Sequence, residues 1–86
     1  MKRIEREILA ALDAAGPKSH AAKIYEVIAR GRINPMPFAE FYTLLNRLAV
    51  EPDGMVSEMI MRNRRVFWLT RNGRRALDKG KRHEAI

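Results

Sequence analysis

The sequence contains no cysteine. This absence excludes disulfides, thiolate nucleophiles and cysteine-ligated zinc, so packing alone must stabilise the fold. Long hydrophobic runs are also missing, because the apolar stretches fall far short of the roughly 20 residues that a membrane-spanning helix needs. The start at Met1-Lys2-Arg3 leads into a charged amphipathic segment, which predicts no secretory signal. These absences predict a soluble cytoplasmic protein with no membrane partner.

Residues that support catalysis or metal binding are scarce. The two histidines, His20 and His83, have no partner at the spacing of a nucleophilic or metal site. No Gly-rich phosphate loop follows a predicted strand, and no pair of carboxylates stands in a recognisable motif. We therefore expect a protein that is not an enzyme and that uses no cofactor, metal ion or small-molecule ligand.

Acidic residues are few in the last third of the 86-residue chain. Residues 1–60 hold eight Lys/Arg and eight Asp/Glu, whereas residues 61–86 hold nine Lys/Arg and only two Asp/Glu. The whole formal net charge of +7 therefore comes from the last third. Such a one-sided segment attracts a polyanion, most often nucleic acid, although acidic membranes and acidic proteins respond to the same field.

The composition is that of a folded soluble domain, since 47% of the residues are apolar and 31% are charged, and the length allows one domain. Three segments space their apolar residues at three and four, as amphipathic helices do, and glycine or proline follows each. Ser19 is the predicted N-cap of the second. The predicted helices are residues 4–15, the segment between Ser19 and Gly31, and the segment from Phe38 to Ala49.

The period changes after residue 54. Residues 55–61 and Val66–Leu69 are short runs typical of strands, and Arg62-Asn63 between them is the predicted tip of a hairpin. Thr70 is then a predicted N-cap for a last short helix that ends at Gly80. Trp68 is expected to close the core beneath the hairpin. The methionines of the first run are expected to serve core or dimer packing.

The predicted fold is mainly α with a small β-hairpin, in the order helix-helix-helix-strand-strand-helix. This is the layout of a winged helix-turn-helix domain, in which the hairpin is the wing. We expect the domain to span residues 1–80 and residues 81–86 to form a basic, frayed tail.

Three stretches resemble the PadR-like winged-helix transcriptional regulators, and more loosely the MarR-like proteins. They are ILAALDAAGPKSHAAKIYEVI (residues 8–28), EFYTLLNRL (residues 40–48) and VFWLTRNGRRAL (residues 66–77). The last matches the family pattern through Leu69, Thr70, Gly73 and Leu77, a core that several winged-helix families share. The resemblance covers the family's DNA-binding domain, from about residue 4 to residue 80, without its C-terminal dimerisation helices.

The resemblance and the element order imply a protein that binds double-stranded DNA sequence-specifically. We expect it to be a small, nucleoid-associated transcriptional regulator. In such a domain the third helix enters the major groove, where asparagine can pair with adenine and arginine with guanine. For each residue of that helix, an ordinary solvent-exposed position without a role in DNA binding is an equal alternative to a base contact. The candidate base-contacting residues are Pro37, Phe38, Glu40, Tyr42, Thr43, Asn46 and Arg47.

The wing and the helix ends supply the remaining candidates. Protruding arginines can lie along phosphates or enter a narrow minor groove, and helix starts can hold a phosphate. The alternative is that these charged residues are only solvent-exposed and bind nothing. For Ser19 the alternative is a role as helix cap. The candidate wing contacts are Arg62, Asn63, Arg64 and Arg65, and the candidate phosphate contacts are Ser19, His20, Lys23 and Arg71.

One small domain presents a small DNA interface, so we expect a homodimer on a two-fold site, formed through the first or the last helix. Two rival functions stay open. The first is a protein-interaction adaptor whose basic segment meets an acidic partner. The second is a non-specific binder of DNA or RNA.

Overall fold

The computed structural model describes residues 3–50 and 54–84. Four helices and one antiparallel hairpin follow each other in the predicted order, and this confirms the mainly α winged-helix layout. The elements are α1 (Arg3–Ala15), α2 (Ala21–Ala29), α3 (Phe38–Val50), β1 (Val56–Met61), β2 (Arg64–Leu69) and α4 (Arg71–Glu84).

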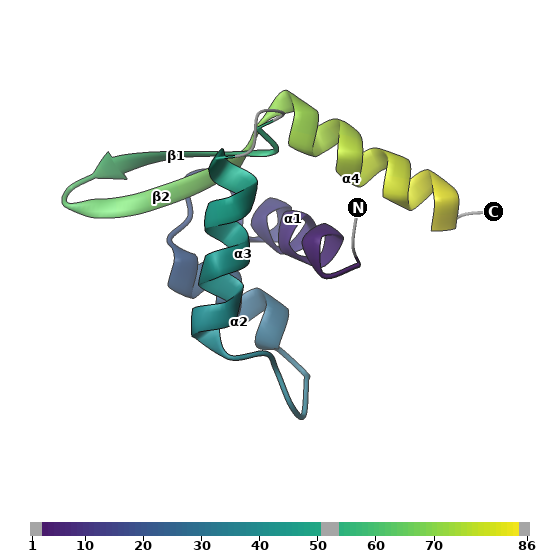
Figure 1. Cartoon of the computed structure of the whole chain (residues 1–86), viewed down its shortest axis with the longest axis horizontal. Helices are drawn as coiled ribbons and strands as arrows, with labels where there is room; N and C mark the ends of the chain where they lie inside the picture. Colours follow the sequence, from purple (N-terminus) through teal and green to yellow (C-terminus); the bar gives the residue numbers. More distant parts are fainter. Residues whose placement is uncertain (1–2, 51–53, 85–86) are drawn as a thin grey trace.

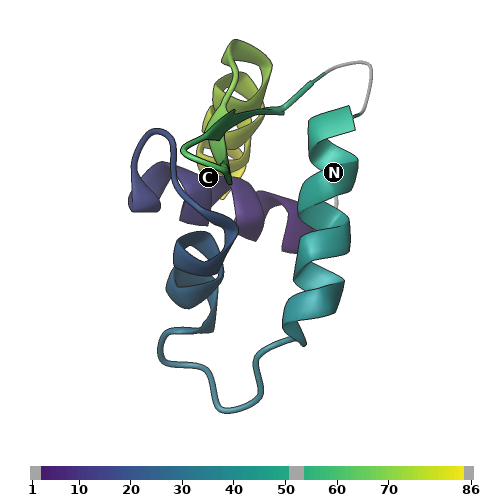
Figure 2. The same cartoon turned by 90° about the vertical axis from the view of Figure 1, so that its left-hand side faces the viewer.

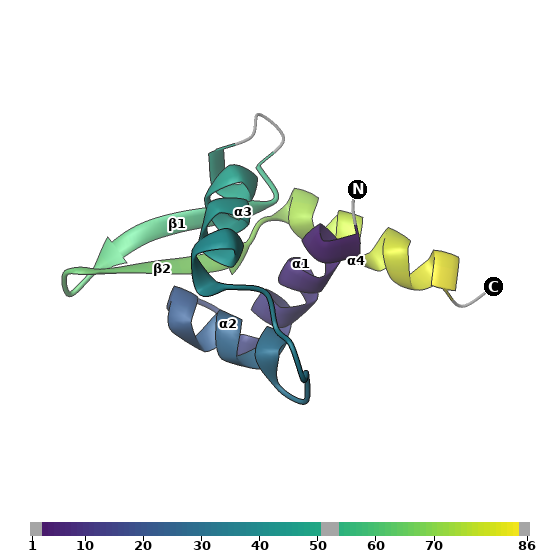
Figure 3. The same cartoon turned by 60° about the horizontal axis from the view of Figure 1, so that its bottom comes forward.

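The helices α1, α2 and α3 form the body of the molecule, and the hairpin and α4 extend from it in opposite directions (Figure 1). The hairpin leaves the body beside α3, as a view turned by 90° also shows (Figure 2). A third view keeps the wing and α4 on opposite sides of the three helices (Figure 3). No described helix is long and apolar enough to cross a membrane.

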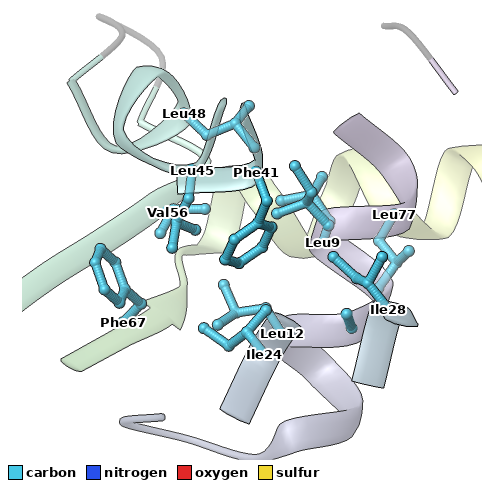
Figure 4. Packing of buried hydrophobic residues seen from close by; sticks show 12 residues of the cluster. Leu9, Leu12, Ile24, Ile28, Phe41, Leu45, Leu48, Val56, Phe67 and Leu77 are labelled. Atoms are coloured by element: carbon cyan, nitrogen blue, oxygen red, sulfur yellow. The ribbon is translucent and has the colours of Figure 1, made fainter. Parts of the chain in front are cut away.

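The core gathers apolar side chains from every element (Figure 4). Phe41 of α3 and Phe67 of β2 are its largest fully buried side chains, and neither is exposed at all. Burying a side chain of this kind contributes about 1.5–3 kcal/mol. Phe67 therefore ties the base of the wing to the helical body. The other members shown are Ile8, Leu9, Ala11, Leu12, Ile24, Ile28, Leu45, Leu48, Val56 and Leu77.

The turn of the hairpin is the one predicted. Arg62 and Asn63 have φ angles of 51° and 64°, the left-handed pair that a two-residue type I′ turn requires. The register pairs Met61 with Arg64 and Val56 with Leu69. Strand β2 starts two residues earlier than Val66, so Arg64 and Arg65 are strand residues rather than part of a loose tip.

Ser19 does not cap α2, contrary to the prediction, because the N-cap residue is His20. Ser19 instead forms a β-bridge with Phe67, in which Ser19 N lies 3.0 Å from Phe67 O and Phe67 N lies 2.8 Å from Ser19 O. Its hydroxyl group donates a hydrogen bond within the preceding turn, where Oγ lies 2.8 Å from Gly16 O and 3.1 Å from Ala15 O. Long-range pairing with β2 has replaced local capping.

Trp68 is only half-buried, so the prediction that it closes the core is wrong. Val66 and Phe67 hold the buried positions of β2, and Phe67 is the one that joins the main cluster. Successive side chains of a strand point to opposite faces, so placing Phe67 inward turns its neighbour Trp68 away from that cluster.

The start of α4 is built as predicted, whereas its end is not. Thr70 Oγ1 accepts a hydrogen bond from Gly73 N at 3.1 Å, which confirms the N-cap. The helix then continues through Gly80 to Glu84. A glycine inside a helix costs only about 1 kcal/mol, so it does not by itself end one. The last residues of the predicted frayed tail, 85–86, lie outside the described residues.

Gly73 explains part of the motif that carries the family resemblance. A Cβ atom at this position would lie 2.1 Å from the carbonyl oxygen of Met55 and 3.0 Å from Leu69 Cδ2. The same Met55 oxygen accepts a hydrogen bond from Thr70 N at 3.2 Å. The first turn of α4 therefore sits directly on the chain that enters β1, and only glycine allows that approach. In this chain the Leu-Thr-x-x-Gly motif is a packing device.

Candidate nucleic-acid interface

The described cations fall into two groups, those with an acidic partner and those without one. In the body, Arg3 and Arg32 both pair with Glu7, and Arg30 pairs with Glu26. The cations that make no ion pair within residues 3–50 and 54–79 lie before and on α2, on α3, at the wing tip and along α4. They are Lys18, Lys23, Arg47, Arg62, Arg64, Arg71, Arg75 and Lys79.

The wing tip consists of Arg62, Asn63 and Arg64, all exposed. The type I′ turn holds these three residues at the end of the hairpin, well away from the helices (Figure 1). Neither arginine has a carboxylate to neutralise it among the described residues. The tip therefore presents two projecting guanidinium groups with free donors, which suits phosphate binding.

Arg65 is different from its neighbour Arg64 because its guanidinium group turns back toward α3. Nε donates to Glu58 Oε2 at 2.7 Å, and Nη2 donates to Asn46 Oδ1 at 2.7 Å. Nη2 also bonds Glu58, and Nη1 bonds the hydroxyl group of Tyr42. One side chain thus joins β2 to β1 and to two residues of α3.

Aromatic rings enclose the same guanidinium group. Arg65 Cζ lies 5.4 Å from the ring centroid of Tyr42 and 5.1 Å from that of Phe67, which are cation–π distances. Hydrogen bonding to Glu58 raises the pKa of Arg65 above its ordinary value, so the group stays charged. Arg65 was predicted to contact DNA from the wing, but its donors are engaged within the protein.

The exposed face of α3 carries Glu40, Thr43 and Arg47, with Asn46 and Tyr42 half-buried at its edge toward the wing. The hydroxyl group of Thr43 donates to Ala39 O at 3.0 Å, so its proton is used within the helix. Arg47 is exposed and without an ion pair among the described residues. This face is the polar surface that the sequence predicted.

Pro37 and Phe38 shape the start of α3. The ring of Phe38 packs 5.2 Å from Tyr25 and 5.7 Å from Phe41, centroid to centroid. Pro37 O accepts the first hydrogen bond of the helix, from Phe41 N at 3.1 Å. Both residues remain exposed, but their observed contacts are those of a structural junction between α2 and α3.

The start of α2 lies against the wing. His20 Nδ1 is 3.3 Å from the carbonyl oxygen of Arg65, which calls for the tautomer protonated at Nδ1. Lys23, one turn later, is exposed and unpaired in the described part of the chain. Ser19 is 8% exposed and its hydroxyl proton is already used, so its proposed phosphate contact loses its support. His20 and Lys23 keep theirs.

Arg71 lies apart from the other candidates. It lies two residues after Leu69, at the end of β2 opposite the wing tip. A six-residue strand spans about 20 Å, so Arg71 and Arg64 are separated by roughly that length. The structure therefore brings α3, the wing and the start of α2 together, and leaves Arg71 outside that group.

Glu58 belongs to the candidate site through its bonds to Arg65, and the sequence analysis did not include it. A signal for it existed. Once Arg62-Asn63 is taken as a two-residue turn, Arg65 faces Ile60 across the hairpin and Glu58 lies diagonally next to it on the same face. Diagonal neighbours on one face are within reach of long side chains, so the turn alone predicts the Glu58–Arg65 pair.

The described residues contain no group of three or more His, Asp or Glu side chains that could hold a metal ion. In comparisons with known proteins, no family model, curated protein or solved structure matches the chain. A functional assignment therefore depends on the fold and the surface geometry.

Proposed function

We propose that the protein binds double-stranded DNA in a sequence-specific manner and acts as a small transcriptional regulator. The observation that carries this proposal is the pair of free arginines at the wing tip, Arg62 and Arg64, on a hairpin that Arg65 fastens to α3. A winged-helix layout presents its third helix and its wing to the same duplex. Here both elements carry unneutralised cations on their exposed sides.

In the proposed complex, α3 lies in the major groove and the wing lies along phosphates or in the adjoining minor groove. Thr43, Asn46 and Arg47 face the base edges, while Lys23 and the wing tip hold the backbone. Glu40 is compatible with this placement where it accepts a hydrogen bond from a cytosine amino group.

A domain of this size buries roughly 600–1,000 Å² on a duplex, which is little for a specific regulator. We therefore propose a homodimer on a two-fold site, in keeping with a PadR-like regulator of the cytoplasmic nucleoid. A two-fold protein predicts an inverted repeat in its preferred sequence.

Selection from random duplexes at physiological salt tests the proposal. We expect enrichment of one sequence, bound at least about 1,000-fold more tightly than bulk DNA, as specific binders of duplexes are. Arg64→Gln is expected to weaken every duplex alike, and Arg30→Gln, on the far end of α2, is the matched control.

Three outcomes would contradict it. Equal affinity for all duplexes and for RNA would indicate a non-specific nucleic-acid binder. No affinity for any duplex would leave the interaction adaptor as the better explanation. An Arg30→Gln variant as weak as Arg64→Gln would show that total charge, and not the wing, determines binding.

A further inference from the structure

The orientation of the Asn46 amide is fixed by chemistry. The guanidinium group of Arg65 can only donate hydrogen bonds, so the atom that faces it at 2.7 Å must be the Asn46 oxygen and not the nitrogen. Asn46 is thereby held with its Oδ1 toward the wing, and rotation of the amide by 180° would bring two donors together.

The amide nitrogen of Asn46 points elsewhere. No group in the described part of the chain accepts a hydrogen bond from Nδ2. Among the described residues no fully buried side-chain nitrogen or oxygen lacks a partner, so Nδ2 keeps some contact with solvent. Asn46 lies on α3 between the exposed Thr43 and Arg47. The accessible edge of this asparagine is therefore its NH₂ group.

The two purines present different groups in the major groove to an asparagine side chain. Guanine shows two acceptors, O6 and N7, whereas adenine shows the N7 acceptor beside the N6 amino donor. Bidentate pairing with adenine needs both edges of the amide, its oxygen accepting from N6. In this protein that oxygen would have to be shared with the guanidinium group of Arg65. An NH₂ group alone suits the two acceptors of guanine.

We propose that Arg65 is a positioning residue that fixes Asn46 as a hydrogen-bond donor, so that α3 selects guanine at the Asn46 position. This rests on the proposed function and differs from the bidentate pairing with adenine that an asparagine can make when both edges of its amide are available. Arg65 is suited to the role because its four hydrogen bonds to Glu58, Tyr42 and Asn46 leave it little freedom to rotate. The Tyr42 and Phe67 rings restrict it further.

The test is the same duplex selection, carried out with the whole chain and with four variants. The base pair that loses its preference in Asn46→Ala defines the Asn46 position. We expect G·C there in the unmodified protein, favoured about tenfold or more over A·T. Arg65→Gln is expected to broaden that one position to include A·T while leaving the other positions unchanged.

Asn46→Asp separates base recognition from structural effects. A carboxylate still accepts from Arg65 but has no donor, so we expect the guanine preference to disappear while the circular dichroism spectrum is unchanged. Arg64→Gln, which alters the exposed neighbour of Arg65, should weaken binding without changing any base preference.

The inference is overturned if the unmodified protein selects A·T at the Asn46 position, if Asn46→Ala changes no position, or if Arg65→Gln or Asn46→Asp keeps the guanine preference. Each of these leaves specific DNA binding intact. A selection that enriches no sequence at all overturns the proposed function, and this inference with it.

Discussion

The two arginine clusters of the last third, on the wing and on α4, look alike in sequence and differ in structure. At the wing tip Arg62 and Arg64 are exposed and have no acidic partner in the described chain. On α4, Arg71 and Arg75 are also exposed and without an ion pair in the described chain, but Arg74 pairs with Asp13 of α1 at 2.5 Å, and hydrogen bonding to that carboxylate raises the Arg74 pKa. Charge alone therefore does not locate a binding surface, because the partners of each cation decide its role.

The two regions also differ in how they are held. The first turn of α4 rests on the Met55 backbone and its Leu77 enters the core. In the outer half of the wing Val66 is the last buried side chain, and beyond it polar contacts of Arg65 hold the hairpin to the body. We expect substitutions on α4 to change stability and substitutions at the wing tip to change binding.

The largest effect is expected at Gly73. In Gly73→Ala the new Cβ atom must displace a backbone carbonyl oxygen, so the free energy of unfolding should fall by about 3 kcal/mol or more. Urea denaturation measures this change. Arg75→Ala, exposed on the same helix, is the control and should stay within about 0.5 kcal/mol of the unmodified protein. A Gly73→Ala variant as stable as the control would refute the packing role of the motif.

Thr70→Ala is the next largest change. It removes the cap that Gly73 N requires and the hydrogen bond from the threonine hydroxyl to Gly54 O. Removing a cap of this kind costs about 1–2 kcal/mol. Thr70→Ser keeps the oxygen and should recover most of that stability in the same denaturation experiment. If serine is no better than alanine, the methyl group and not the cap is what matters.

Arg65→Gln should lower the free energy of unfolding by about 1 kcal/mol, because its bonds are several but half-exposed. Hydrogen exchange should show a larger acceleration for the wing amides than for the α1 amides, which follow the loss of global stability. Arg64→Gln, one residue away, should alter neither measurement. Equal behaviour of the two variants would mean that the Arg65 contacts do not anchor the wing.

The smallest effect on stability, and a purely functional one, is expected at the wing tip. Removing one phosphate-binding cation should reduce the slope of log affinity against log salt by about 0.9. We expect this for Arg62→Gln and Arg64→Gln and no change for Arg75→Gln, measured by fluorescence anisotropy on one duplex. A slope that falls equally in all three would place α4 on the DNA as well.

The sequence predicts those parts of the fold that depend on local periodicity. The helical spacing of apolar residues, the N-cap at Thr70 and the hairpin tip at Arg62-Asn63 each act within a few residues, and the structure confirms them. Two predictions that failed, for Ser19 and Trp68, depend on how strand β2 packs and pairs with the rest of the chain. That packing joins segments far apart in the chain.

The candidate site divides in the same way. Glu40, Thr43 and Arg47 were predicted from one helix face and are exposed there. The tie between Arg65 and Asn46 joins two elements, and helix periodicity contains no information about it. Only the register of the hairpin together with the position of α3 reveals that a wing arginine contacts the proposed recognition helix.

The bridge between Ser19 and Phe67 has a consequence for how the molecule opens. An isolated two-stranded hairpin is marginally stable in water, and here the chain before α2 adds a third backbone partner at its base. The two amides of that bridge are protected only while the first and last thirds of the chain are joined. Their exchange with solvent should therefore require global unfolding, whereas the amides near the tip should exchange by local opening of the hairpin. The base of the wing is thus expected to be more stable than its tip.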